Sequence, residues 1–248
     1  HLPWTGPGRP VRLPPVRRFF SEGRILVNTT TPAVRGTVYG VILNDRDSLA
    51  RLGSALEDAP YKAAPKSVPL YLKPANTVVA SGATVYLPAG ETAVEVGATL
   101  GVVFSAPAAR LAPEQVAGVI AGYVVVADLS LPHSSYYRPA IREKCFDGAC
   151  PVGARVVSPA EVGELAAVTL NTWVDGVLTQ SRCLADLVRE VPTLVSEVSQ
   201  FMTLNSGDML LLGVVWQAAQ AAVGAQVRVE AGTLGSVEFA LAADKEQA

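Results

Sequence analysis

One stretch of the chain, residues 127–153, gathers side chains that could do chemistry within a mostly apolar surrounding. Its ionisable and aromatic polar residues are Asp128, His133, Tyr136, Tyr137, Arg138, Arg142, Lys144 and Asp147. An arginine guanidinium can hold a carboxylate through two parallel hydrogen bonds, and a lysine supplies a point charge. The pattern therefore predicts a binding site for a polyanionic small molecule. The alternative is a solvated loop whose charges pair with one another.

The supply of histidine and cysteine excludes several other kinds of site. The chain has two histidines, His1 and His133, which leaves almost no raw material for a histidine-rich metal centre or a Ser-His-Asp triad. His133 follows a proline in a polar loop and is either a solvated histidine or a proton shuttle. The three cysteines, Cys145, Cys150 and Cys183, do not suggest a disulfide framework, so we expect a reducing, cytoplasmic location.

Composition and charge narrow the class of protein further. Of the 248 residues, 50% are hydrophobic and 17% are charged, which excludes a disordered chain. Lys and Arg number 20 and Asp and Glu 22, so a net charge of -2 offers no field that attracts nucleic acid or an anionic membrane. The longest apolar stretch, residues 209–227, is interrupted by three glutamines and is interpreted as a buried strand followed by a surface segment.

The elements that must position these residues are mainly strands. Alternating or continuous apolar runs predict strands at residues 38–43, 68–74, 84–88 and 92–104. Asp175-Gly176 tolerates the positive φ angles of a tight turn and predicts a hairpin. Because helices do not alternate regularly with the strands, the pattern indicates an α+β, mainly β fold with a largely antiparallel sheet.

Helix signals are few and short. A helix is expected at residues 49–56, another after Pro113 through residues 114–123, and a third after the capping box of Ser158 and Glu161. Pro192 opens a fourth helix. The apolar residues that should form its buried face are Leu194, Val195, Val198, Phe201 and Met202.

The first 33 residues differ from the rest of the chain. They are rich in proline and arginine, which predicts an extended segment and not a packed unit. We therefore divide the chain into an N-terminal extension, residues 1–33, and one domain, residues 34–248. The extension is either a leader or an arm that docks on a partner subunit.

Four strings of the sequence carry a resemblance to a known family. They are "APYKAAPKSVPLYLKPANTVV" (59–79), "GYVVVADLSLP" (122–132), "YYRPAIREKCFDGACPVG" (136–153) and "FMTLNSGDMLLLG" (201–213). Residues 34–240 resemble the fumarylacetoacetate hydrolase family, with the matching strings in the same order and almost no gaps between them. Within that family they resemble the branch that degrades homoprotocatechuate in the 4-hydroxyphenylacetate pathway. The resemblance implies a mixed β-sandwich roll with a few short helices.

The resemblance also implies an activity. Enzymes of that branch decarboxylate 5-oxopent-3-ene-1,2,5-tricarboxylate and isomerise the resulting 2-hydroxyhepta-2,4-diene-1,7-dioate. They are built from two homologous repeats, either in one chain or in two. This chain resembles the first repeat. The implied partners are a di- or tricarboxylate substrate and either further copies of the chain or a second, metal-bearing homologous subunit, with no nucleic acid and no membrane.

The cofactor that the family uses is Mg2+ or Mn2+, held by a Glu-x-Glu pair on one strand and an Asp further on. Here the Asp matches Asp128, but the two Glu positions fall on Gly97 and Thr99. Glu95 lies two residues earlier, roughly 6.6 Å along the strand. A single carboxylate is a poor site for a divalent cation, so we expect weak or absent metal binding in this chain.

Other family positions have also changed. A His and a Glu that act as an acid–base pair fall on Ser48 and Arg51, and a Thr-Gly-Thr-Pro turn falls on residues 212–215. No catalytic residue is therefore assigned. By resemblance or by charge, the residues expected to bind substrate are Lys73, Arg138, Lys144, Asp147 and Gln180.

Three interpretations remain open from the sequence. The chain is a subunit of the decarboxylase/isomerase, inactive by itself because metal ligands are missing. Alternatively it is a non-catalytic scaffold for the metal-bearing subunit, or a dicarboxylate-binding module.

Overall fold

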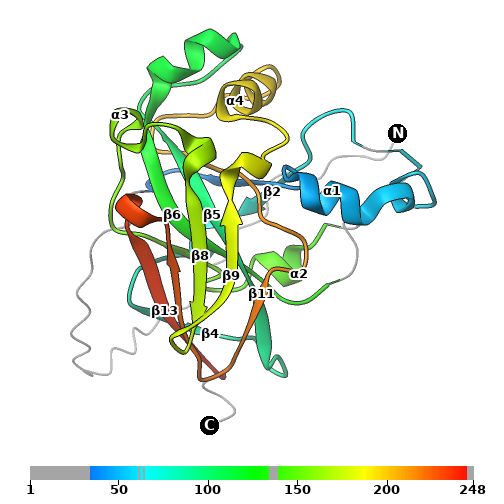
Figure 1. Ribbon diagram of the computed structural model, residues 1–248, viewed down its shortest axis with the longest axis vertical. Helices are drawn as coiled ribbons and strands as arrows, with labels where there is room; N and C mark the ends of the chain where they lie inside the picture. Colours follow the sequence, from blue (N-terminus) through cyan, green and yellow to red (C-terminus); the bar gives the residue numbers. More distant parts are fainter. Residues whose placement is uncertain (1–33, 61, 64, 134–138, 245–248) are drawn as a thin grey trace, which may run out of the picture.

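The computed structural model describes residues 34–60, 62–63, 65–133 and 139–244, so the proposed extension lies outside the described residues. The strands form two sheets (Figure 1). The larger sheet has the order β2 (Leu70–Lys73), β1 (Val38–Val41), β10 (Met209–Leu211), β5 (Ala93–Phe104), β6 (Ile120–Ser130), β7 (Cys150–Val152) and β3 (Val78–Ala80), with β11 (Ala219–Ala222) paired to β5. The smaller sheet has the order β4 (Ala83–Tyr86), β13 (Ser236–Ala242), β12 (Gln226–Glu230), β8 (Thr169–Val174) and β9 (Val177–Cys183).

Both sheets are mixed. Most neighbouring strands are antiparallel, but β1 with β10, β3 with β7 and β4 with β13 are parallel. This architecture confirms the α+β, mainly β prediction and the two-sheet roll.

Within the described residues, no helix is both long and apolar enough to cross a membrane.

Helices are short and lie around the sheets. The α-helices are α1 (Arg46–Leu52), α2 (Ile141–Lys144), α3 (Pro159–Val162) and α4 (Val191–Ser199). The 3-10 turns are η1 (Gly53–Leu56), η2 (Ala75–Thr77), η3 (Pro113–Val119), η4 (Leu165–Ala167), η5 (Leu184–Asp186) and η6 (Gly232–Leu234). In Figure 1, α4 lies towards the upper end of the molecule and α1 at its right-hand side.

The two faces of the long β5–β6 pair have different roles because side chains alternate along a strand. On one face, Val96 and Leu100 of β5 and Val125 and Leu129 of β6 join residues of the smaller sheet in the main hydrophobic core. The opposite face carries a smaller apolar cluster built on β5, β6, β7 and β10. Polar residues of the same two strands lie on this second face, which therefore holds the candidate site.

Several local predictions are confirmed. Ser158 caps α3, and its hydroxyl and the carboxylate of Glu161 form the expected reciprocal capping box. Asp175 and Gly176 have φ angles of 50° and 78° and close the hairpin between β8 and β9.

Two helix predictions need correction. The helix expected at residues 114–123 ends at Val119, and Ile120 already begins β6. The β-branched residues Val119 and Ile120 fit a pleated strand better than a helix. Phe201 does not share the buried face of α4: the helix ends at Ser199, and Phe201 is 63% exposed.

Candidate functional site

Asp128 is the centre of the candidate site. It lies on the second face of β6, directly opposite Gly97 of β5. The same alternation places Glu95 and Ser130 beside them, and these residues line one small cavity. Period-two alternation alone therefore brings the predicted carboxylate and both lost ligand positions to one face of the sheet.

Two lysines and a tyrosine hold the carboxylate of Asp128. Lys73 Nζ lies 2.7 Å from Oδ1, and Lys144 Nζ lies 3.5 Å from Oδ2. The hydroxyl of Tyr71 donates a hydrogen bond to Oδ2. Asp128 is 1% exposed, so these partners neutralise a charge that water cannot reach. We call Tyr71, Lys73, Asp128 and Lys144 the Asp128 cluster.

Lys73 is locked in place by the backbone. Its ammonium group donates to three carbonyl oxygens, those of Leu129 at 2.7 Å, Lys144 at 2.8 Å and Ala149 at 2.9 Å. An ammonium has three protons, so all of its donors are used. Lys73 thus joins β6, the end of α2 and the residues before β7, and it has no proton left for a ligand.

Lys144 is the available cation of the cluster. It ends α2 and is 5% exposed, and its Nζ lies 4.5 Å from the centre of the Tyr71 ring. Within the described residues its only polar side-chain contact is the 3.5 Å contact with Asp128. Because an ammonium with unused protons lines the cavity, Lys144 is the group best placed to bind an oxyanion.

The surroundings shift the pKa values of this cluster. Burial raises the pKa of Asp128, but the charges of Lys144 and Lys73 outweigh it and hold that pKa below its usual value. Burial lowers the pKa of Lys144, with Lys73 adding to this and Asp128 opposing it. Burial raises the pKa of Glu95 above its usual value, and the charges of His133 and Lys144 lower it by a smaller amount.

The residues present do not fit a divalent cation. Both oxygens of Asp128 already face cations or a hydroxyl, and Gly97 and Thr99 offer no carboxylate. A side chain at position 97 would meet Val214, because a Cβ there would lie 2.5 Å from Val214 Cγ1. Among the described residues, no group of three His, Cys, Asp or Glu side chains could hold a metal ion.

The cavity over the Asp128 cluster is small. Its free volume is about 20 Å³, and Val214 and Val215 form one of its walls. An open groove of about 700 Å³ adjoins it through Glu95, His133 and Ala218. The cavity therefore has room for one oxyanion group, and the rest of a ligand would have to lie in this outer groove.

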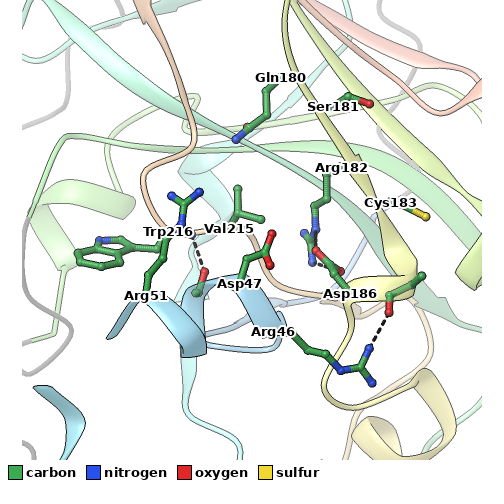
Figure 2. A pocket seen from close by; sticks show the side chains of 12 residues that line it. Arg46, Asp47, Arg51, Gln180, Ser181, Arg182, Cys183, Asp186, Val215 and Trp216 are labelled. Carbon is green, nitrogen blue, oxygen red and sulfur yellow. Dashed lines mark hydrogen bonds and ion pairs between the residues drawn. The ribbon is translucent and has the colours of Figure 1, made fainter. Parts of the chain in front are cut away.

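The other predicted substrate-binding residues do not join the cluster. The carboxylate of Asp147 is exposed and accepts a hydrogen bond from Asn76 in a turn at 2.7 Å. Gln180 lies on β9 and borders a different pocket (Figure 2). Arg138 lies outside the described residues. Val214 belongs to the segment that matches the family's site-lining turn, and it does line the cavity. Sequence reasoning missed Tyr71, although it stands two residues before Lys73 and therefore on the same strand face.

Sequence comparison identifies the family of this fold and site. The profile of the fumarylacetoacetate (FAA) hydrolase C-terminal domain matches residues 37–242. The chain belongs to the fumarylacetoacetate hydrolase family. Among its relatives is the 4-hydroxyphenylacetate degradation bifunctional isomerase/decarboxylase of Escherichia coli, 36% identical over 213 residues. That match covers 86% of this chain and 48% of the relative, so the chain spans about half the length of this curated relative.

Solved structures of this family share the fold. Fumarylpyruvate hydrolase from Pseudomonas aeruginosa, solved with Mn2+ and pyruvate, superposes with a TM-score of 0.73 at 21% identity, covering 92% of this chain and 100% of that one. The 5-carboxymethyl-2-hydroxymuconate delta-isomerase from Mycobacterium smegmatis gives 0.70 at 23% identity, covering 84% and 79%. Members of the fumarylacetoacetate hydrolase family thus bind divalent metals, whereas in the described part of this chain the matching carboxylate, Asp128, is paired with two lysines.

Metal titration checks this difference. In calorimetry with Mn2+ or Mg2+, we expect no saturable binding, because the charges of Lys73 and Lys144 repel a cation from Asp128. The Asp128→Asn variant should titrate like the unmodified chain. If the unmodified chain binds the metal stoichiometrically and Asp128→Asn does not, Asp128 is a metal ligand and the prediction is wrong.

Proposed function

We propose that this chain is the metal-free repeat of a decarboxylase/isomerase in 4-hydroxyphenylacetate catabolism. The substrates would be 5-oxopent-3-ene-1,2,5-tricarboxylate and 2-hydroxyhepta-2,4-diene-1,7-dioate. The observation that carries the proposal is the Asp128 cluster: two lysines neutralise the carboxylate that the family uses for its metal. The relatives of this activity are about twice as long, which leaves room for a second, metal-bearing repeat.

In this proposal the two repeats divide the chemistry. The second repeat carries the Mg2+ or Mn2+ that stabilises negative charge on the substrate, and this chain supplies a metal-free anion site at Lys144. The assembly would act in the cytoplasm, with residues 1–33 as an extension and residues 34–248 as the domain. The buried position of Lys144 strengthens its attraction for a carboxylate, because little water screens the charge.

A scaffold is the second candidate function. The observation that favours it is the volume of about 20 Å³ over the cluster, which is too small for a whole tricarboxylate. In that case the Asp128 cluster only stabilises the fold, and the chain contributes surface to the metal-bearing repeat. The two candidates differ in one respect: a scaffold does not need the unused protons of Lys144.

Reconstitution tests the proposed function. The chain should show no Mg2+-dependent decarboxylation of the tricarboxylate by itself. Together with a homologous repeat that carries the Glu-x-Glu pair, it should co-elute in size-exclusion chromatography and restore turnover. Mg2+-dependent turnover by the chain alone, or failure of the two repeats to associate, would refute the proposal.

A further inference from the structure

A mostly apolar pocket of about 470 Å³ lies between η3, α3, η4, η5 and the start of α4, and the first residues of β6 also line it. Its neighbours α3 and α4 are found towards the upper end of the molecule (Figure 1). We call it the apolar pocket. It shares no residue with the cavity over the Asp128 cluster, so the proposed function does not use it.

The wall of the apolar pocket is the surface of the main hydrophobic core. Its larger apolar side chains are Val116, Ile120, Leu165, Leu184, Leu187 and Val191. All six belong to the main core or pack directly against it. The pocket is therefore preformed, because its wall is held by the packing of the fold itself.

Tyr123 adds one hydroxyl to this apolar lining. The residue is 6% exposed, and its backbone is fixed by two hydrogen bonds with Val157, each of 2.8 Å. Burial raises the pKa of Tyr123, so the hydroxyl stays protonated and uncharged. Within the described residues it has no hydrogen-bond partner. A buried polar group needs such a partner, and a molecule in the pocket can supply one.

The exposed edge of the apolar pocket is negatively charged. Glu114, Glu164 and Glu190 line it, and in the described part of the chain none of their carboxylates has an ion pair or a hydrogen bond. Arg46 is the one cation among the lining residues; it donates to the carbonyl of Ala185 at 2.7 Å and also borders the pocket of Figure 2. Three carboxylates thus face one guanidinium.

We infer that the apolar pocket binds a small molecule that joins an apolar body to an ammonium group. The apolar body supplies affinity, because contact with the core removes its surface from water. An ammonium has three donors and no acceptor, so it pairs with a carboxylate and with the oxygen of Tyr123. A volume of about 470 Å³ falls within the usual range for small-molecule sites.

The charge of the pocket separates it from the site of the proposed function. The substrates proposed above are anions, and a carboxylate in the apolar pocket would meet three like charges. Because the three glutamates are exposed, water screens them, and they select the sign of the ligand's charge more than they add affinity.

Three probes with the same apolar body test this preference: phenylbutylamine, phenylbutanol and phenylbutanoate. Calorimetry on the whole chain should show saturable binding of the amine. The alcohol should bind about three- to tenfold more weakly, the effect of a few exposed ion pairs, and the acid more weakly still. Equal affinity for the three probes, tighter binding of the acid, or no binding of the amine would overturn the inference.

Substitutions at the edge test the role of the carboxylates. Glu164→Gln with Glu190→Gln should weaken binding of the amine about three- to tenfold and leave binding of the alcohol unchanged. The matched control is Glu57→Gln with Glu238→Gln, two exposed glutamates outside the pocket, which should change neither affinity. If both pairs of substitutions weaken the amine equally, the attraction is a general property of the surface and the inference is wrong.

Substitutions inside the pocket locate the ligand. Tyr123→Phe removes the hydroxyl but keeps the ring, and should weaken binding of the amine at least about twofold. Ala117→Phe places a ring in the pocket from an exposed position of η3 and should abolish binding. Unfolding curves of both variants should match those of the unmodified chain, because neither change removes a contact that holds the fold. Unchanged affinity in either variant would overturn the assignment.

Light scattering tests a different occupant, a second copy of the chain. The inference predicts that Ala117→Phe leaves the oligomeric state unchanged. If this variant instead dissociates an oligomer of the unmodified chain, the apolar pocket is an interface between copies and not a ligand site.

Discussion

Replacing Lys73 with methionine is expected to lower the free energy of unfolding by about 3–5 kcal/mol, the usual cost of removing one partner of a buried ion pair. The change removes a hydrogen-bond donor from three carbonyl oxygens and takes a cation from a carboxylate that is 1% exposed. Methionine fills a similar volume, so packing contributes little. Urea unfolding measures the effect.

The control for this prediction is Lys66→Met, which removes the same charge from an exposed position and should change stability by no more than about 0.5 kcal/mol. A loss below about 1 kcal/mol in Lys73→Met would mean that the ion pair and the three carbonyl contacts do not hold the fold together. In Lys73→Met with Asp128→Asn, the destabilisation should be smaller than in Lys73→Met alone, because the buried carboxylate that loses the Lys73 cation is also removed and Lys144 is then the one charged side chain left in the cluster.

The pH dependence of the stability of Lys73→Met tests whether the charge of Asp128 causes the loss of stability. In the unmodified chain the pKa of Asp128 is lowered in the folded state, so its ion pairs stabilise the fold above the unfolded pKa and lose this effect as the pH falls. In Lys73→Met, Lys144 is the one cation left beside Asp128, so burial favours the protonated acid more strongly, and protonation relieves part of the cost of the lost ion pair. The stability difference between the two proteins should therefore shrink between neutral pH and about pH 4.

Much of the fold follows from local patterns. The alternation in β5 places Val96 and Gly97 on opposite faces, and the turn at Asp175-Gly176 follows from residues that tolerate positive φ angles. The exception at residues 114–123 has a physical reason. Proline opens a helix there, but the apolar residues that follow are needed by the long β5–β6 pairing, and this tertiary demand overrides the local signal.

The candidate site was only partly predictable. Asp128, Lys73 and Lys144 are recognisable from the sequence, and the loss of carboxylates at Gly97 and Thr99 explains why no metal is expected. The locking of Lys73 could not be foreseen, because all three acceptors are backbone carbonyls from distant segments. The pocket that Gln180 borders depends on the position of α1 relative to β9, which no local pattern encodes.

Replacing Lys144 with methionine is expected to weaken binding of a dicarboxylate such as 2-oxoadipate by about 1.5–3 kcal/mol, or roughly 10- to 150-fold. Lys144 is the cation of the Asp128 cluster with unused protons, and it lines the cavity where one oxyanion group fits. Calorimetry on the chain with and without its partner repeat measures the effect. Unfolding curves accompany it, because removing Lys144 also takes one of two cations from Asp128.

The matched control is Arg142→Met, two residues earlier on α2. The Arg142 side chain is 64% exposed and pairs with Glu91 at 2.7 Å, so its loss should not change dicarboxylate affinity. If Lys144→Met binds the dicarboxylate as tightly as the unmodified chain and supports full activity of the reconstituted pair, the scaffold function is correct. If affinity and reconstituted turnover fall together while Arg142→Met retains both, then Lys144 binds the substrate carboxylate, and the chain takes part in the reaction without a metal of its own.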